Sequence, residues 1–177
     1  MESERRSLDL LAAWCLRLLW DGVYDSWVQV AQDAGLTVTE EQILFAIWLS
    51  EGSTVTEAAF LLQRDKGTVS KALYSLEVSG LVTREVLRDR RYAEFRLTPR
   101  GEKLLQDLLT RHVRGQDLAF AQGFLSLDEG ERLAFLRTAF KLVRCVYGNE
   151  YIVKLQQLKN LPDCMRELLS TLKEETG

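Results

Sequence analysis

The sequence predicts a mainly α-helical fold with one small β-hairpin, and three observations support this prediction. Apolar residues recur at spacings of three and four along most of the chain, which is the period of a helix with a buried face. The segments 81–87 and 92–98 are instead rich in β-branched and aromatic residues, as strands are. A polar tip, Arg88-Asp89-Arg90-Arg91, joins these two segments. A helix pair followed directly by a basic hairpin is the layout of a winged helix.

The first helix is expected over residues 7–34, with Gly35 ending it. One side presents an apolar stripe that includes Leu11 and Leu18, and the opposite side is also bulky, with Trp14 and Trp20. A helix that is apolar nearly all round needs partners on several sides. A second copy of the chain could supply them.

Two capping boxes, Thr39-Glu40-Glu41-Gln42 and Thr54-Val55-Thr56-Glu57, predict the starts of the next two helices. These helices should stop near Gly52 and Gln63. A turn follows, with Asp65 as the expected N-cap of a helix over residues 66–79.

The helix over 66–79 has two distinct faces. Its inward stripe is Val69, Ala72, Leu73 and Leu76. Its outward face carries hydroxyls, one lysine and one tyrosine, and no acid before Glu77: Thr68, Ser70, Lys71, Tyr74 and Ser75. Such a surface can enter a major groove and bind base edges without repelling phosphates.

Beyond Thr98 the pattern is helical again. One long helix is expected from Pro99 to about residue 121, and a capping box at Ser126-Leu127-Asp128-Glu129 predicts the next. A break is expected near Gly148-Asn149, and a last helix over residues 162–172. The apolar residues of this tail, like those of the first helix, suit a dimer interface or the core of a monomer: Leu158, Leu161, Met165, Leu168 and Leu172.

The net charge of −3 does not by itself indicate nucleic acid, but the charge is unevenly distributed. Residues 64–100 hold nine basic and five acidic residues, a balance of +4, which leaves −7 for the rest of the chain. A basic segment in an acidic frame suits a protein that presents one face to phosphates.

The sequence contains no recognisable catalytic or metal-binding motif. The three cysteines, Cys15, Cys145 and Cys164, form no C-x-x-C pair, and His112 is the single histidine. We therefore expect no metal, no cofactor and no enzymatic activity, with the cysteines as core or interface residues. Scattered, odd-numbered cysteines favour the cytoplasm, and the apolar run 8–20, interrupted by two charges, is too short to span a membrane.

Residues 40–112 resemble the DNA-binding domain of the MarR family of transcriptional regulators. The resemblance rests on Thr54-Val55-Thr56-Glu57-Ala58-Ala59, Gly67-Thr68-Val69-Ser70-Lys71 and Leu76-Glu77-Val78-Ser79-Gly80-Leu81-Val82. The family's Asp-x-Arg and Leu-Thr-x-x-Gly signature falls on Asp89, Arg91, Leu97, Thr98 and Gly101, with five residues between Arg91 and Leu97 where the family has six. The segment 143–151 is also similar to one in the Hpr/ScoC transition-state regulators, a branch of this family.

The resemblance implies a role for each part of the hairpin tip. Arg91 would enter a minor groove with Asp89 holding its guanidinium, and Arg88 and Arg90 would meet phosphates or share the groove. The operator would then be A·T-rich at its flanks, because narrow A·T-rich grooves attract arginine. The family is dimeric through its first and last helices, which predicts a pseudo-palindromic site. Many relatives bind aromatic acids, and a comparable effector site could be lined by Trp20, Tyr24, Trp27 and Trp48.

The sequence thus predicts three regions: a dimerisation helix over 1–38, a winged helix-turn-helix domain over 39–112 and a helical dimerisation region over 113–177. The predicted function is that of a homodimeric transcriptional regulator that binds double-stranded DNA, and a repressor is favoured over an activator. Two alternatives stay open at this point. One is a winged-helix adaptor that binds protein, and the other is a regulator gated by an effector or by redox chemistry.

Overall fold

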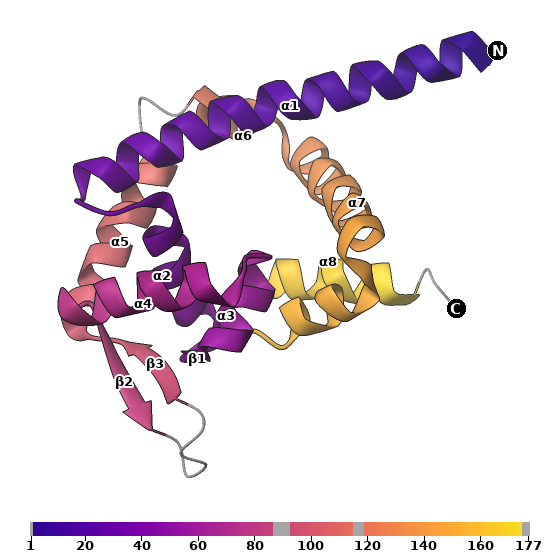
Figure 1. Ribbon diagram of the computed structural model, residues 1–177. Coiled ribbons are helices and arrows are strands. Elements are labelled where there is room, and N and C mark those ends of the chain that lie inside the picture. The colour runs from indigo at the N-terminus through magenta and orange to yellow at the C-terminus, as the bar shows by residue number, and fades with distance from the viewer. Residues whose placement is uncertain (1, 87–92, 115–118, 175–177) are drawn as a thin grey trace. The chain divides into compact units, whose positions relative to one another are not determined.

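The computed structural model of the protein describes residues 2–86, 93–114 and 119–174 (Figure 1). The chain divides into two compact units. The first comprises Met1–Val38 and Asp107–Leu127, and the second comprises Thr39–Gln106 and Asp128–Gly177. Both units are therefore built from segments that lie far apart in the sequence.

The first unit contains the long helix α1 (Glu2–Asp33), the end of α5 (Pro99–Arg114) and α6 (Ala119–Ser126). α1 contacts α6, and the ring of Trp27 meets that of His112 edge-on, with 6.1 Å between centroids. Gly35, at φ 73°, follows α1 as predicted, in a left-handed conformation that glycine adopts without strain. Most large apolar side chains of α1 are exposed in the single chain: Leu8, Leu10, Leu11, Trp14, Leu16, Leu18, Leu19, Trp20 and Tyr24.

The second unit holds the helix-turn-helix and a three-stranded antiparallel sheet. Its elements are α2 (Val38–Ser50), β1 (Ser53–Thr54), α3 (Val55–Leu62), α4 (Lys66–Val78), β2 (Val82–Val86) and β3 (Ala93–Leu97). The strand order is β1-β3-β2, with Ser53 opposite Phe95 and Val82 opposite Leu97. The hairpin was predicted from the sequence, whereas the two-residue strand β1 was not. The core of this unit is aliphatic: Ile43, Leu44, Ile47, Val69, Leu73, Leu76, Val82 and Leu105 are almost completely buried.

Two of the four predicted helix caps are confirmed and two are wrong. Thr54 and Glu57 form a reciprocal capping box at α3, and the Asp65 side chain caps α4. α2, however, begins at Val38, so Thr39 lies inside the helix. At α7 the capping box is Asp128 with Glu131, one of two overlapping patterns in that stretch, and not Ser126 with Glu129. Asp128 is at least as good an N-cap as serine, so the helix starts later.

The C-terminal part of the second unit consists of α7 (Glu129–Gln156) and α8 (Asp163–Glu174). The predicted break is confirmed at Gly148, whose φ of 82° and ψ of 171° kink α7. Beyond the kink, Ile152, Leu169 and Leu172 form one buried cluster between α7 and α8. Leu158 forms a second cluster with Ala46 of α2 and Leu61 of α3. The tail is thus packed against the helix-turn-helix of its own chain.

The helix predicted over residues 99–121 is shorter in the structure. α5 ends at Arg114 and α6 starts at Ala119, with residues 115–118 outside the described part. Within the described ranges, none of the helices combines the length and the apolar character that a membrane crossing requires.

Candidate nucleic-acid interface

The start of α4 is fixed by one side chain. Asp65 accepts hydrogen bonds from the Thr68 backbone N–H at 2.8 Å and from the Thr68 hydroxyl at 2.5 Å. These bonds lower the pKa of the Asp65 carboxyl, the hydroxyl bond contributing most. The Thr68 hydroxyl therefore faces Asp65 with its proton, and only its oxygen lone pairs remain available to another molecule.

The outward face of α4 is the one that the sequence predicts. Val69, Leu73 and Leu76 are 0–1% exposed and anchor the helix to the core. The five residues of the predicted recognition face are all exposed: Thr68, Ser70, Lys71, Tyr74 and Ser75. Tyr74 is 70% exposed. A helix fixed on one side and polar on the other can present these groups to a groove without reorganising.

A hollow lies beside this face, between α4, the start of α3 and the sheet. Its walls include Ser70 and Tyr74 from α4 and Arg84 from β2, and Glu77 contributes a carboxylate, the one among the lining residues that the structure describes. Its remaining lining residues are Thr54, Val55, Thr56, Ala93 and Phe95. Two residues of the predicted recognition face, Ser70 and Tyr74, thus also line a concave site that holds one positive and one negative side chain among the described residues.

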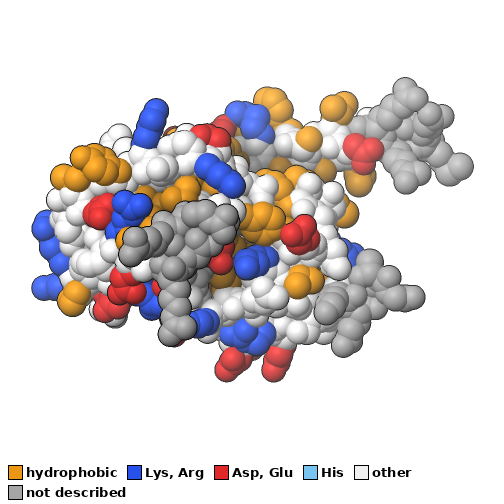
Figure 2. Space-filling model, turned by 60° about the horizontal axis from the view of Figure 1, so that its bottom comes forward, with side chains coloured by type: hydrophobic (Ala, Val, Ile, Leu, Met, Phe, Trp, Pro, Cys, Tyr) orange, Lys and Arg blue, Asp and Glu red, His pale blue; other side chains and the backbone are white. Residues whose placement is uncertain are grey.

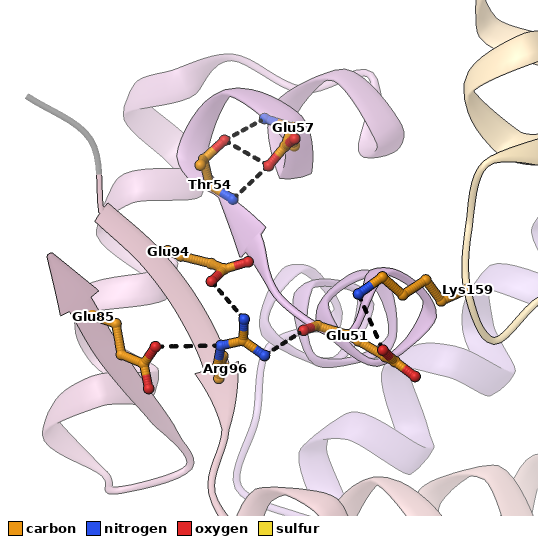
Figure 3. Close-up of polar contacts among 7 residues, drawn as sticks. All are labelled: Glu51, Thr54, Glu57, Glu85, Glu94, Arg96 and Lys159. Atoms are coloured by element: carbon orange, nitrogen blue, oxygen red, sulfur yellow. Dashed lines mark hydrogen bonds and ion pairs between the residues drawn. The ribbon is translucent and has the colours of Figure 1, made fainter. Parts of the chain in front are cut away.

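The described part of the hairpin is held by Arg96 of β3. Its guanidinium pairs with Glu94 at 2.8 Å and with Glu85 of β2 at 3.4 Å (Figure 3). Glu85 and Glu94 lie directly opposite each other in the β2–β3 register, an arrangement that like charges disfavour. Arg96 relieves this repulsion, and the two carboxylates raise its pKa, the hydrogen bond that Arg96 donates to Glu94 contributing most. Arg96 is therefore committed to the sheet and not to a partner.

Four predicted site residues, Arg88, Asp89, Arg90 and Arg91, lie outside the described residues. On the face of the molecule drawn in Figure 2, Lys and Arg side chains are interspersed with Asp and Glu. The charge excess of residues 64–100 therefore depends strongly on the hairpin tip, which holds three of its nine basic residues.

Close hydrogen-bonded contacts join the end of α4 to the start of α5. The Thr98 hydroxyl donates to the Gly80 carbonyl at 2.8 Å and accepts from the Gly101 N–H at 3.0 Å. A Cβ on Gly101 would lie 2.0 Å from the carbonyl oxygen of Leu81, so only glycine fits there. Arg100 also donates to the Ser79 carbonyl at 3.1 Å. The Leu-Thr-x-x-Gly pattern thus has a structural purpose, which is to fix the hairpin relative to α4.

The residues predicted to form a dimer divide into two groups. Leu11 and Leu18 of α1 are 66% and 52% exposed in the single chain. Leu158 and Leu172 are buried by residues of their own chain, and Leu161, Met165 and Leu168 are half-buried. Burial of Leu158 and Leu172 accords with the monomer-core alternative for those two residues, and the dimer interface stays a prediction.

The predicted effector-site aromatics lie in different units. Trp20 stacks on Tyr24 along α1, with 5.6 Å between centroids, and Trp27 meets His112, all within the first unit. Trp48 stacks on Phe45 in the second unit at 5.8 Å. Cys15, Cys145 and Cys164 are exposed in the single chain, so they are not core residues there, and the interface alternative for them stays a prediction.

Comparison with known proteins agrees with this geometry. A sequence model of the MarR family matches residues 34–91, which span α2 to β2 and enter the hairpin tip. None of the curated proteins compared gives a match. The region from α2 to β2 is thus similar to the MarR family, and the match is confined to residues 34–91.

Three of the solved structures that share the fold illustrate the likeness. A MarR family transcription regulator has a TM-score of 0.68 and 22% identity, over 81% of this chain and 93% of its own. BpsR of Bordetella bronchiseptica, whose DNA binding is regulated by 6-hydroxynicotinic acid, has a TM-score of 0.63 and 21% identity, over 75% of this chain and 98% of its own. Reduced AbfR bound to DNA has a TM-score of 0.61 and 17% identity, over 82% of this chain and 99% of its own. At these identities the likeness establishes a MarR-like winged helix-turn-helix fold with a helical region beside it.

Proposed function

We propose that this protein is a sequence-specific double-stranded DNA-binding transcriptional regulator that acts as a homodimer, and that it represses by occupying promoter DNA. The observation that supports this most is the outward face of α4. Five exposed polar residues, none acidic, stand on a helix whose inward residues Val69, Leu73 and Leu76 are buried. A solvated helix face in an acidic protein has no structural need to exclude acids.

In this proposal Lys71 meets a phosphate or a base, and Ser70, Tyr74 and Ser75 contact base edges with Thr68 at the helix start. Arg91 enters the minor groove, with Asp89, Arg88 and Arg90 around it. A solved structure of reduced AbfR bound to DNA shares the fold and supports DNA as the partner by analogy. The operator is then a pseudo-palindrome with A·T-rich flanks.

The proposed homodimer forms through α1 and the C-terminal helices. Its support is the run of large apolar side chains that α1 exposes in the single chain, including Leu11 and Leu18. Many large apolar side chains exposed along one helix indicate an interaction site, and a two-fold axis would match the symmetry of the operator. We also propose a place in the Hpr/ScoC-like branch, supported by the 143–151 segment, whose Gly148 kinks α7.

A second candidate is that a small aromatic effector gates the DNA binding. The hollow beside α4 supports it, because Ser70 and Tyr74 line both this hollow and the proposed DNA-reading face. An acid held against Arg84 would therefore compete with DNA for the same side chains. If an aromatic acid releases bound DNA from the wild type but does not release it from an Arg84→Ala variant, gating is supported.

The test of the main proposal is selection from a randomised duplex pool, followed by fluorescence-anisotropy titration at two salt concentrations. The wild type is compared with Arg91→Ala. Salt-sensitive binding that weakens in the variant, chiefly on A·T-rich sites, is expected. Absence of binding at low salt, with or without an aromatic acid, would overturn the proposal in favour of an adaptor that binds protein.

A further inference from the structure

The tail, residues 149–174, docks on the helix-turn-helix of its own unit. Leu158 is 5% exposed and packs with Ala46 of α2 and Leu61 of α3. Tyr151 lies against Phe60 of α3, with 5.7 Å between ring centroids. Burial raises the pKa of the Tyr151 hydroxyl, so it remains a neutral hydrogen-bond donor at ordinary pH.

The tail also satisfies the C-terminal ends of both helices before the recognition helix. The last carbonyls of a helix have no partner within it. For α2, Asn160 donates its backbone N–H to the Leu49 carbonyl at 3.0 Å and its Nδ2 to the Trp48 carbonyl at 2.7 Å. For α3, the Tyr151 hydroxyl donates to the Leu61 carbonyl at 2.8 Å. Residues from the tail therefore cap helices about a hundred positions earlier in the chain.

Glu51 joins this tail to the hairpin. It occupies the turn after α2 with a φ of 56°, and its side chain accepts from Lys159 Nζ of the tail at 3.1 Å. Its backbone carbonyl accepts from Arg96 Nη1 of β3 at 2.9 Å (Figure 3). One turn residue is thus held from the tail on one side and from the hairpin on the other.

The turn is also in direct steric contact with β3. Gly52, at φ 131°, leaves room for the Glu94 side chain, since a Cβ there would lie 2.6 Å from Glu94 Oε1. β1 follows at once and pairs with β3, Thr54 opposite Glu94. A displacement of the turn must therefore move β1 or β3. β1 leads into α3, and β3 is one of the two strands of the hairpin.

We propose that the docked tail positions the hairpin for DNA binding, and that Asn160 and Lys159 are the positioning residues. They act through the turn at Glu51 and through the guanidinium of Arg96. Release of the tail loosens the β1–β3 pair and lowers the affinity for DNA without changing any group that contacts DNA. The effect on affinity rests on the function proposed above, whereas the link between tail and strand pair does not.

The test uses the full-length protein and four variants. Asn160→Asp has the same shape but puts a carboxylate in place of the amide donor to Trp48. Lys159→Ala breaks the exposed ion pair to Glu51, and Lys159→Arg keeps its charge. Lys154→Ala is the matched control, because it removes the same charge from the tail, and the Lys154 side chain makes no hydrogen bond or ion pair within the described chain. Amide hydrogen exchange and DNA affinity are measured for each.

Asn160→Asp should speed exchange selectively at residues 53–54 and 93–97 and lower DNA affinity about three-fold or more, the range of couplings through packed networks. Lys159→Ala, whose exposed ion pair cannot be needed for folding, should shift both readouts the same way but less. Lys159→Arg and Lys154→Ala should match the wild type.

Two results would overturn the positioning role. The first is faster exchange in residues 149–160 with unchanged exchange in the β1–β3 pair, which would mean that the tail moves without the hairpin. The second is an equal rise of exchange in α4 and α5, which would mark a general loss of stability. A wild type that binds no duplex would count against the proposed function alone, since the exchange measurement would still decide the link between tail and strands.

Discussion

Gly101→Ala should destabilise the protein although alanine favours helix. Gly101 lies in the first turn of α5, and an added Cβ would be 2.0 Å from the Leu81 carbonyl oxygen and 3.0 Å from its carbon. Real Cβ contacts below 3.0 Å are essentially never seen, and a backbone carbonyl cannot rotate away as a side chain can. The start of α5 and the start of β2 must therefore separate.

The expected magnitude follows from two opposing terms. Overpacking costs about 1–3 kcal/mol, and a clash with backbone belongs at the upper end of that range. The gain in helix propensity from glycine to alanine returns about 1 kcal/mol. The net loss should be about 2 kcal/mol or more, because separation also strains the hydrogen bond from the Thr98 N–H to the Leu81 carbonyl at 3.0 Å.

Urea denaturation followed by circular dichroism measures this loss. The matched control is Gly123→Ala in α6, where a Cβ would meet no atom within 4 Å, so that variant should be as stable as the wild type or slightly more. If Gly101→Ala unfolded at the wild-type urea concentration with the same m-value, the close approach of α5 to Leu81 would be refuted.

Three further predictions concern the cap of α4, its outward face and the dimer. Because hydrogen bonds from Thr68 lower the pKa of Asp65, its charge stabilises the fold above pH about 4 and this contribution disappears as the pH falls through the folded pKa. The urea midpoints of wild type and Asp65→Asn should therefore differ at pH 7 and converge at low pH; a constant difference would contradict this. Lys71→Ala should reduce the slope of log affinity against log salt by about one unit, whereas Lys103→Ala on α5 should not. Leu11→Asp should yield monomers in size-exclusion chromatography with light scattering, with helix content retained; a stable mutant dimer would refute the α1 interface.

The local structure could be predicted where short-range chemistry decides it. The inward stripe of α4 follows from the helical period, and Asp65 and Thr54 are the caps that their residue types favour. The pair Gly148-Asn149 predicts a break, and the structure confirms it at Gly148, whose φ of 82° glycine adopts without strain. The outward face of α4 could also be predicted from the helical period, because it consists of the positions that do not belong to the inward stripe.

Features that depend on distant contacts could not be predicted. β1 has two residues, too few for any alternation, and exists because Ser53 and Thr54 pair with β3 some forty positions later. Asn160 looks like a loop residue in the sequence, and its role as a cap of α2 depends on how the tail folds back. Leu158 and Leu172 could equally suit a core or an interface, because an apolar stripe does not specify what covers it.

The measurement that tests the central claim most directly is the specificity of Tyr74→Ala. Tyr74 is 70% exposed on the outward face of α4, so its truncation should leave the stability unchanged. The affinity for a selected duplex is divided by the affinity for a scrambled duplex of the same composition, at one salt concentration. If α4 reads base edges, this ratio should fall about five-fold or more in the variant. An unchanged ratio in a folded variant that still binds DNA would contradict the claim that this face of α4 recognises sequence.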